Sequence, residues 1–380
     1  MDTSEGRVKT AQKHTSNEIG EKLFAGALFT LAINYLLYST GNLLGLQTPL
    51  RLLSCGLLIC AACFNFKKIR LDLLLILILG KSMLTSMLIG VEGLNLLLIV
   101  LVGMVASSYG MECCRRILYK LAIVLIALYV ILWGIGLIHP GMTAYSGRVR
   151  NNFGFTNVNA ASLFFIGVSL IPLSAKKRQI LPAVASLAFI FAVVALTDTR
   201  SALLSTIALI ALCLLFAVFE RRGQWRYQFR IAQIVIIGAV VVSLLLPLLR
   251  ATPLDALLSF RPSFFYSAIK GLSIVEIMMG TSTPMEIDNS YLLFMLVYGA
   301  VTLFLSLLLL LRGVRGLAEQ GEWVPLAFVC SMVLLGIVEG CLFRPEPIIT
   351  LAFWSYVFLG AFHSNPFSEE LSKQGSVHLK

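Results

Sequence analysis

The sequence predicts an all-α integral membrane protein, a polytopic bundle of about twelve transmembrane helices. Of its 380 residues 58% are hydrophobic and only 13% are charged, whereas about 25% charged is usual in soluble domains. Apolar runs of about 20 residues, the length that crosses a bilayer, recur along nearly the whole chain. Lys and Arg collect in alternate connections between these runs. A soluble single-core protein is therefore excluded, and no room is left for a separate globular domain.

Each apolar run is a predicted transmembrane helix, with boundaries uncertain by several residues. The runs are 23–44, 49–66, 72–90, 94–110, 117–138, 157–173, 180–197, 201–219, 230–249, 289–311, 324–342 and 347–362. Some are short, so eleven or thirteen helices are also compatible with the pattern. The first run lacks a small-residue cleavage site, which favours a retained helix over a signal peptide. We expect a polar cytoplasmic tail (1–22), a membrane domain (23–363) and a second cytoplasmic tail (364–380).

The distribution of basic residues predicts the orientation of the bundle. With a cytoplasmic N-terminus, every inner segment is basic, including 67–70, 115–120, 176–178, 221–230 and 312–315. The outer segments then hold few cations, as the positive-inside rule requires. Both termini are therefore expected in the cytoplasm, and the net charge of +11 reflects topology. It does not point to a nucleic acid partner.

Two predicted outer loops, 139–156 and 250–288, are longer than simple turns. Loops of that length in a compact bundle are often functional. In the second loop, apolar residues recur at helical spacing until Gly280: Phe264, Phe265, Ala268, Leu272, Val275 and Met279. This pattern predicts an amphipathic helix on the outer membrane surface or over a cavity.

Four arginines on the outer side are candidates for binding an anion. Arg148, Arg150, Arg200 and Arg261 lie where cations should be scarce. Guanidinium groups that converge on one side are suited to phosphate or pyrophosphate. The alternative is that each reaches a lipid phosphate or pairs locally, as Arg200 could with Asp198 and Arg344 with Glu346.

The segment GFTNVNAAS (154–162) enters the sixth predicted helix. Gly154 permits a turn, and Asn157 and Asn159 can cap the helix. The two asparagines could also bind sugar hydroxyls, or a phosphate at the positive end of the helix. Simple capping is the alternative for either residue.

Asp288 stands at the outer end of the tenth predicted helix, followed by Asn289 and Ser290. It could be an N-cap, or a general base that deprotonates a sugar hydroxyl. Glu286 raises a rival interpretation, an acidic pair that binds a divalent cation. Because arginines can neutralise a leaving group, we favour a site without a metal.

Other reactive residues carry weaker signals. None of the eight cysteines has histidines at metal spacing, so neither a zinc site nor a disulfide framework is expected. Lys81 and Glu339 lie within apolar segments. We interpret them mainly as structural partners of other helices, with an ion or proton relay as the alternative.

Over residues 145–312, the order of these motifs resembles the bacterial O-antigen ligase and Wzy-type polysaccharide polymerase superfamily. The matching positions are Gly154, Asn157, Asn159 and Ala160; Arg200 and Ser201; Arg261, Gly271 and Gly280; then Asp288, Asn289, Tyr291, Leu292 and Gly299. The chain departs from the pattern at Val158, where the family often has Pro. It also has Asp288 where ligases usually show His, which favours a polymerase.

The resemblance implies a GT-C-like bundle in the bacterial cytoplasmic membrane with its active site on the outer face. The implied reaction is inverting glycosyl transfer from an undecaprenyl-pyrophosphate-linked glycan to a lipid-linked repeat unit, without metal or cofactor. It assigns Asp288, Arg261 and Arg200 to catalysis. Substrate binding falls to Arg148, Arg150, Asn157, Asn159, Asn289 and Tyr291. A flippase and a chain-length regulator are the implied protein partners.

Two other functions remain open. An O-antigen ligase would use the same donor with a lipid A core acceptor. A transporter or flippase of lipid-linked glycans would show internal symmetry and charged or broken helices near the midplane. The candidate residues instead cluster at one predicted membrane face, which favours an enzyme.

Overall fold

The protein is helical almost throughout, as predicted. A computed structural model describes residues 3–41, 44–89, 91–139, 141–145, 148–175, 180–258, 260–281 and 287–362. About 81% of the chain is helix. The strands found among the described residues form one two-stranded antiparallel hairpin within the first long loop, β1 (Met142–Tyr145) paired with β2 (Arg148–Asn151).

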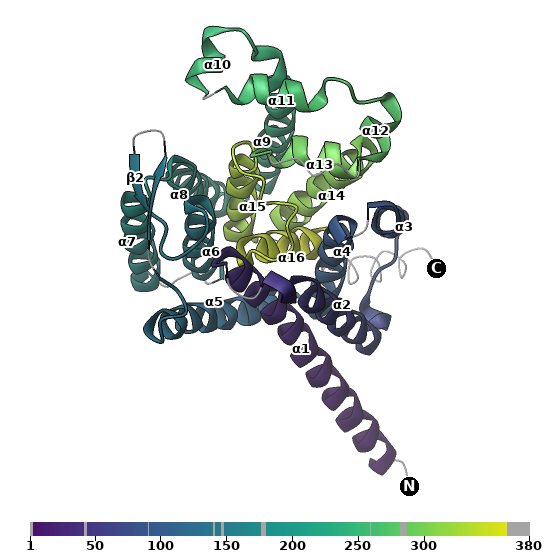
Figure 1. Cartoon of the computed structure of the whole chain (residues 1–380). Helices are drawn as coiled ribbons and strands as arrows, with labels where there is room; N and C mark the ends of the chain where they lie inside the picture. The colour runs from purple at the N-terminus through teal and green to yellow at the C-terminus, as the bar shows by residue number, and fades with distance from the viewer. Residues whose placement is uncertain are drawn as a thin grey trace.

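The elements follow the chain in the order shown in Figure 1. The first half holds α1 (Thr3–Ser39), α2 (Gln47–Phe64), α3 (Leu73–Ile89), α4 (Val91–Tyr109), α5 (Met111–Gly134), α6 (Val158–Ala175) and α7 (Ile180–Thr197). The second holds α8 (Arg200–Arg221), α9 (Trp225–Leu245), α10 (Pro253–Leu257), α11 (Arg261–Ile269), α12 (Ile274–Met279), α13 (Ser290–Tyr298), α14 (Ala300–Glu319), α15 (Trp323–Leu335) and α16 (Ile348–Phe362).

The predicted apolar runs reappear as apolar helices. In the described part of the chain, six are long and apolar enough to cross a membrane, and six shorter apolar helices accompany them. The protein therefore has the character of a multi-pass membrane protein, while the number of crossings stays a prediction. Helix α1 begins at Thr3, inside the segment 1–22 that we expected to be a tail.

The centre of the bundle is formed by α15 and α16 (Figure 1). Every residue of α16 is buried. Helices α14 and α16 cross at glycines, where a Cβ on Gly360 would come within 2.1 Å of the carbonyl oxygen of Gly313. Such close backbone approach is typical of helix packing in membranes.

The second long loop folds into three short helices in place of the single amphipathic helix that we predicted. Helix α11 ends at Ile269, because Gly271 takes a φ of +102° and Ser273 starts α12 with a capping box to Glu276. Phe265 packs inward, whereas Phe264 and Val275 are exposed. The expected division into apolar and polar faces therefore holds only in part.

The tenth predicted helix, 289–311, is broken into α13 and α14 at Gly299. The end of α12 packs against this break, and Thr281 N donates to the carbonyl of Leu296 at 2.8 Å. A Cβ on Gly280 or on Gly299 would lie 2.2 Å from a carbonyl oxygen of the opposite segment. Lys81 of α3 donates to the carbonyl of Met279, so it supports the end of α12.

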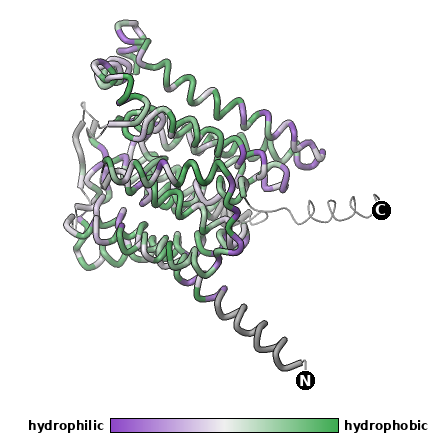
Figure 2. Tube along the Cα trace, turned by 90° about the vertical axis from the view of Figure 1, so that its right-hand side faces the viewer, coloured by the Kyte–Doolittle hydropathy of each residue, from purple (hydrophilic) through white to green (hydrophobic). Residues whose placement is uncertain are grey.

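Most of the predicted inner segments gather at one end of the bundle, which we call the basic end. Three ion pairs tie these segments together there: Arg116–Glu21, Arg115–Glu322 and Arg312–Asp72. The cluster 176–178 lies outside the described residues. Figure 2 shows hydrophobic stretches between more hydrophilic helix ends. The charge alternation therefore predicted which of these segments share an end.

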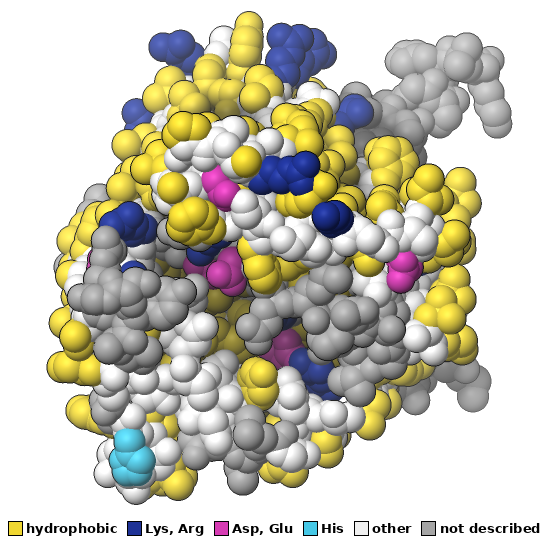
Figure 3. All heavy atoms as spheres, turned by 45° about the horizontal axis from the view of Figure 1, so that its top comes forward, with side chains coloured by type: hydrophobic (Ala, Val, Ile, Leu, Met, Phe, Trp, Pro, Cys, Tyr) yellow, Lys and Arg dark blue, Asp and Glu magenta, His cyan; other side chains and the backbone are white. Residues whose placement is uncertain are grey.

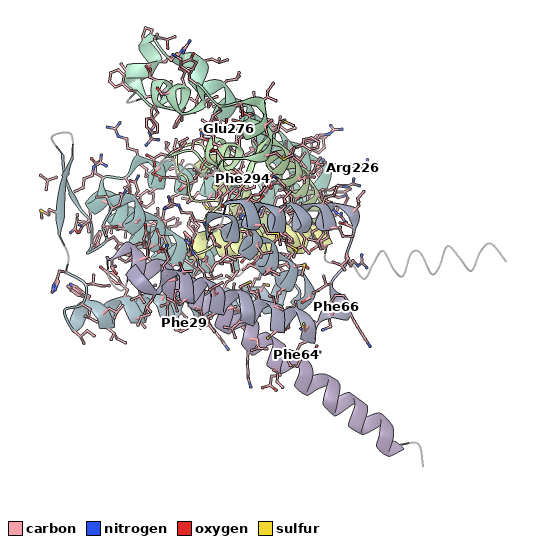
Figure 4. All side chains as sticks on the ribbon, turned by 45° about the vertical axis from the view of Figure 1, so that its right-hand side comes forward. Phe29, Phe64, Phe66, Arg226, Glu276 and Phe294 are labelled. Carbon is pink, nitrogen blue, oxygen red and sulfur yellow. The ribbon has the colours of Figure 1, made fainter. Side chains whose placement is uncertain are left out.

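The outer surface of the N-terminal helices is apolar. Phe29, Phe64 and Phe66 lie on the outside of the bundle (Figure 4) and are 37%, 43% and 63% exposed. Phe294 of α13, by contrast, is fully buried in the interior. Exposed rings of this kind suit contact with lipid, in agreement with a membrane location.

Candidate functional site

A polar cavity of about 420 Å³ lies at the end of the bundle opposite the basic end. Its walls come from the ends of α1 and α6, the start of α2, Asn95 of α4, residues 287–288 and the segment 339–347. Figure 3 shows carboxylate and basic side chains together in the hollowed part of this face. Its volume is within the range of roughly 300–1,000 Å³ typical of small-molecule sites.

Asp288 lines this cavity with a carboxylate that its own helix does not use. Asn289, and not Asp288, caps α13: its Oδ1 accepts from Tyr291 N and Leu292 N at 3.0 and 2.9 Å. The Asp288 side chain is 59% exposed and lies 3.6 Å from Arg261. The capping interpretation of Asp288 is therefore wrong, and its carboxylate can reach a ligand.

Arg261 connects the second long loop to the edge of the site. It begins α11, and its Nη1 donates to the carbonyl of Val338 at 3.2 Å. Its Nη2 faces the Asp288 carboxylate, and its side chain is 37% exposed. The guanidinium thus keeps exposed surface beside Asp288, as an anion-binding role requires.

Glu339 is a second carboxylate in the cavity wall. The predicted run 324–342 ends as a helix at Leu335, so Glu339 lies in the connection between α15 and α16, where it is 5% exposed. Ser201 at the start of α8 donates to its Oε1 at 2.7 Å. Burial raises the pKa of Glu339 to about 7. The Ser201 hydrogen bond, Arg261 and Arg344 lower this pKa, while the charge of Asp288 raises it.

Two further arginines line the cavity, in different states. Arg51 of α2 forms a buried ion pair with Glu346, with 7% and 6% of the two side chains exposed. Arg344 is exposed, and it makes no ion pair with any residue that the structure describes. The expected local pair Arg344–Glu346 is therefore replaced by a pair between residues 295 positions apart.

Asn157 and Asn159 both line the cavity at the start of α6. Asn157 Oδ1 accepts from Asn159 N at 2.8 Å, which confirms the predicted capping by Asn157. Asn159 lies inside α6 and does not cap it. Gly154 takes a φ of +81°, the turn that the sequence predicted before this helix. Capping leaves the Asn157 side chain exposed, so it remains available to a ligand.

Asn289 and Tyr291 do not reach the cavity. They are 0% and 1% exposed. Asn289 Nδ2 donates to Ser243 and to the carbonyl of Ile337, and the Tyr291 hydroxyl donates to the carbonyl of Val333. The prediction that they bind substrate directly is not supported, because their polar groups are engaged in holding α13 under the site.

The three predicted arginines whose side chains are described do not converge. Arg150, Arg200 and Arg261 are absent from the described residues that line the cavity. Arg150 faces Asp198 at 3.8 Å, and Arg200 is exposed at the start of α8. Arg148 lies on β2, and its side chain is outside the described part. Of the three described side chains, only Arg261 is placed beside a carboxylate of the site.

The cation-binding alternative depended on Glu286, which lies outside the described residues. Within the described ranges, no group of three or more His, Cys, Asp or Glu side chains is arranged to hold a metal ion. Whether a cation acts here is a question for a chelator experiment.

The most important residues missed as site candidates are Glu339, Arg344, Arg51 and Glu346. The segment EGCLFRPEP (339–347) carries three charges at the edge of an apolar run. That density was a usable signal for a functional connection. Arg51 gave no comparable signal, because its partner follows 295 residues later.

Comparison with known proteins adds no family to this description, since no family model, curated protein or solved structure matches the chain.

Proposed function

We propose that this protein is a bacterial polysaccharide polymerase of GT-C-like architecture. It transfers an undecaprenyl-pyrophosphate-linked glycan to a lipid-linked repeat unit at the outer face of the cytoplasmic membrane. The observation that carries the proposal is the cavity at one end of the bundle, where Asp288 and Glu339 meet beside Arg261 and Arg344. Carboxylates and guanidinium groups together are the chemistry that such a transfer requires.

In the proposed reaction, Asp288 accepts the proton of the attacking sugar hydroxyl. The hydroxyl oxygen forms a bond to the anomeric carbon of the donor as the bond from that carbon to the pyrophosphate oxygen breaks. Undecaprenyl pyrophosphate leaves with the electron pair, and the arginines stabilise its charge. Direct displacement inverts the anomeric carbon.

Glu339 supplies a second carboxyl to the site in this scheme. Burial and the charge of Asp288 raise its pKa to about 7. An ionised Glu339 places a negative charge in the cavity wall, which favours the positive charge that develops at the anomeric carbon in the transition state. Ser201 and the neighbouring arginines keep Glu339 ionisable near neutral pH.

Apolar surface beside the site supports a lipid-linked substrate. Leu257, Phe260, Phe264, Ile274 and Val275 of the second long loop are each more than half exposed. They flank Arg261 in sequence. A polyprenyl chain could lie against this surface while its pyrophosphate meets the arginine.

The one-ended distribution of the site supports an enzyme over a transporter. The described cavity-lining residues all belong to segments at the end away from the basic clusters. At the basic end, ion pairs link α1, α5, α14 and the connections around them. A transporter would require the site to be reached from that end as well.

The test is an assay of the purified protein with defined undecaprenyl-pyrophosphate repeat units. A ladder of longer lipid-linked products is expected. Products formed only when a lipid A core acceptor is supplied would assign the protein to the ligases. Movement of the lipid-linked unit across a vesicle membrane without new glycosidic bonds would replace the enzyme by a flippase.

A further inference from the structure

The cavity is lined by charged and by uncharged polar side chains. The charged ones are Asp288, Glu339, Arg344, Arg51 and Glu346. Among the uncharged ones are Asn34, Tyr35, Tyr38, Gln47 and Asn95, and we call the wall that these five form the amide half. These side chains come from α1, α2 and α4, which lie outside the region that carried the sequence motifs.

Amide side chains are expensive to place inside an apolar bundle. Asn34 is only 2% exposed. An amide without hydrogen-bond partners costs roughly 2–7 kcal/mol on transfer to an apolar environment. Asn34 Nδ2 approaches the carbonyl of Gln47 only at 3.4 Å, a long hydrogen bond. Amides from separate helices that line one cavity are the arrangement expected where a polar ligand is bound.

The charges that reach the amide half come in opposite signs. Arg51 is paired with Glu346, and both are buried. Arg344 and Glu339, of opposite charge, both lie close enough to act on Tyr35. A charged ligand in this half would therefore lose hydration without gaining Arg51 as a counter-ion. Amides and tyrosine hydroxyls, by contrast, both donate and accept hydrogen bonds, as sugar hydroxyls and acetamido groups require.

The position of the amide half relates it to the acceptor. Asp288 lines the same cavity, whereas Arg261, Arg150 and Arg200 lie outside it. If the leaving group binds at Arg261, the hydroxyl that Asp288 deprotonates belongs to a sugar inside the cavity.

From these observations we propose that the amide half is a subsite for an uncharged sugar ring of the acceptor repeat unit. The assignment to the acceptor rests on the proposed polymerase function. Sugar binding by itself does not, so the two can be tested separately.

The first experiment measures sugar binding without turnover. Purified full-length protein is titrated by calorimetry with chitobiose, a neutral acetamido disaccharide, and with digalacturonate, a charged one. Chitobiose should bind at least about tenfold more tightly, the difference expected from one or two hydrogen bonds. Equal binding of the two sugars, or no binding of chitobiose, would overturn the proposal.

Two variants with matched controls identify the subsite. Asn34→Leu and Gln47→Leu should each weaken chitobiose binding about tenfold. Thr30→Val and Ser54→Ala are the controls on the same helices, since their hydroxyls bond carbonyls one turn away and do not line the cavity. Because Gln47 is only half-buried at the start of α2, its variant should fold even if Asn34→Leu does not. Unchanged binding by a folded Gln47→Leu would count against the subsite.

Steady-state kinetics then assign the sugar to donor or acceptor. The same variants should raise KM for the acceptor about tenfold and leave KM for the donor unchanged. A rise in donor KM alone would overturn the acceptor assignment. If the wild type binds chitobiose but forms no ladder, the polymerase proposal fails and the sugar subsite stands.

Discussion

At the scale of single residues, helix capping and the candidate general-base role fall to two neighbouring residues, Asn289 and Asp288, which the sequence alone could not separate. Asn289 caps α13 while Asp288 faces Arg261 across the rim of the cavity. Each residue can therefore be tested without disturbing the other.

We predict that Asp288→Asn lowers the rate of transfer by about 10² to 10⁴, the loss typical of a missing general base. Its melting temperature should stay unchanged, because the cap of α13 is intact. Asn289→Ala is the matched control, and it should lower stability by about 0.5–2 kcal/mol as a lost cap does. Full turnover by Asp288→Asn, or loss of wild-type activity with chelator that divalent cations restore, would remove the general-base role.

Glu339 predicts a pH dependence. Its pKa of about 7 means that the wild-type rate should rise as pH passes through 7, because ionised Glu339 adds a negative charge to the cavity wall where the anomeric carbon becomes more positive in the transition state. Glu339→Gln should abolish this rise in rate around pH 7. Ser201→Ala should move it to higher pH, since it removes a hydrogen bond that lowers the pKa. A wild-type profile that is flat around pH 7 would contradict this coupling.

The same carboxyl should affect stability with a defined sign. Its pKa in the folded protein is about 7, above the ordinary 4.5. Its stabilising contribution is therefore complete below pH 4.5 and is lost as pH rises through 7. Over that range, the wild type should lose stability relative to Glu339→Gln.

The arginines should separate in their effects. Arg261→Lys keeps a charge but loses the planar fork beside Asp288 and Val338, so transfer should fall by about 10². Arg200→Lys should change the rate only a few-fold, because among the described contacts Arg261, and not Arg200, lies beside Asp288. An equal loss of transfer rate in both variants would show that Arg200 also contributes to binding the leaving group.

At the scale of elements, α12 and the break between α13 and α14 form one packed unit. Gly280 and Gly299 have φ values of +98° and +89°, and each presses against the opposite backbone. Their fit determines where the second long loop returns to the bundle. The loop carries Arg261 of the proposed site at the start of α11, so the placement of the loop matters for activity.

We predict that Gly299→Ala lowers stability by at least about 1–2 kcal/mol, because the left-handed conformation penalises a Cβ and no space exists for one. Limited proteolysis should then cut more readily around α12. Gly56→Ala on the exposed side of α2 is the control, since its Cβ would meet nothing within 4 Å. Equal stability of Gly299→Ala and the control would refute the packing argument.

At the scale of the whole molecule, the two ends of the bundle differ in chemistry. One end collects basic clusters and their ion pairs, and the other holds the cavity. From the positive-inside rule we predict that the cavity faces outward.

Cysteine labelling in intact cells checks this orientation. In an active background without the native cysteines, Lys270→Cys near the cavity end should react with a membrane-impermeant thiol reagent. Lys67→Cys at the basic end should react only after permeabilisation. The reverse labelling pattern would show the inverted topology, with the site on the cytoplasmic side.

The sequence by itself determined the class of the protein and the sorting of its segments. Apolar runs long enough for a bilayer predict helices wherever they occur, since lipid leaves the backbone no other partners. Basic connections predicted which segments meet at one end, as the Arg116–Glu21 and Arg312–Asp72 pairs show. These properties depend on local composition alone.

Only the tertiary structure decided which polar groups meet. Arg51 forms an ion pair with Glu346, and Ser201 donates a hydrogen bond to Glu339, which lies 138 positions later in the chain. Both contacts form because packing brings distant helix ends together. The same packing broke the tenth run at Gly299, buried Tyr291 and left Arg200 outside the cavity. Local sequence patterns do not show which distant residues come into contact. They therefore predicted the motifs around the site better than the site itself.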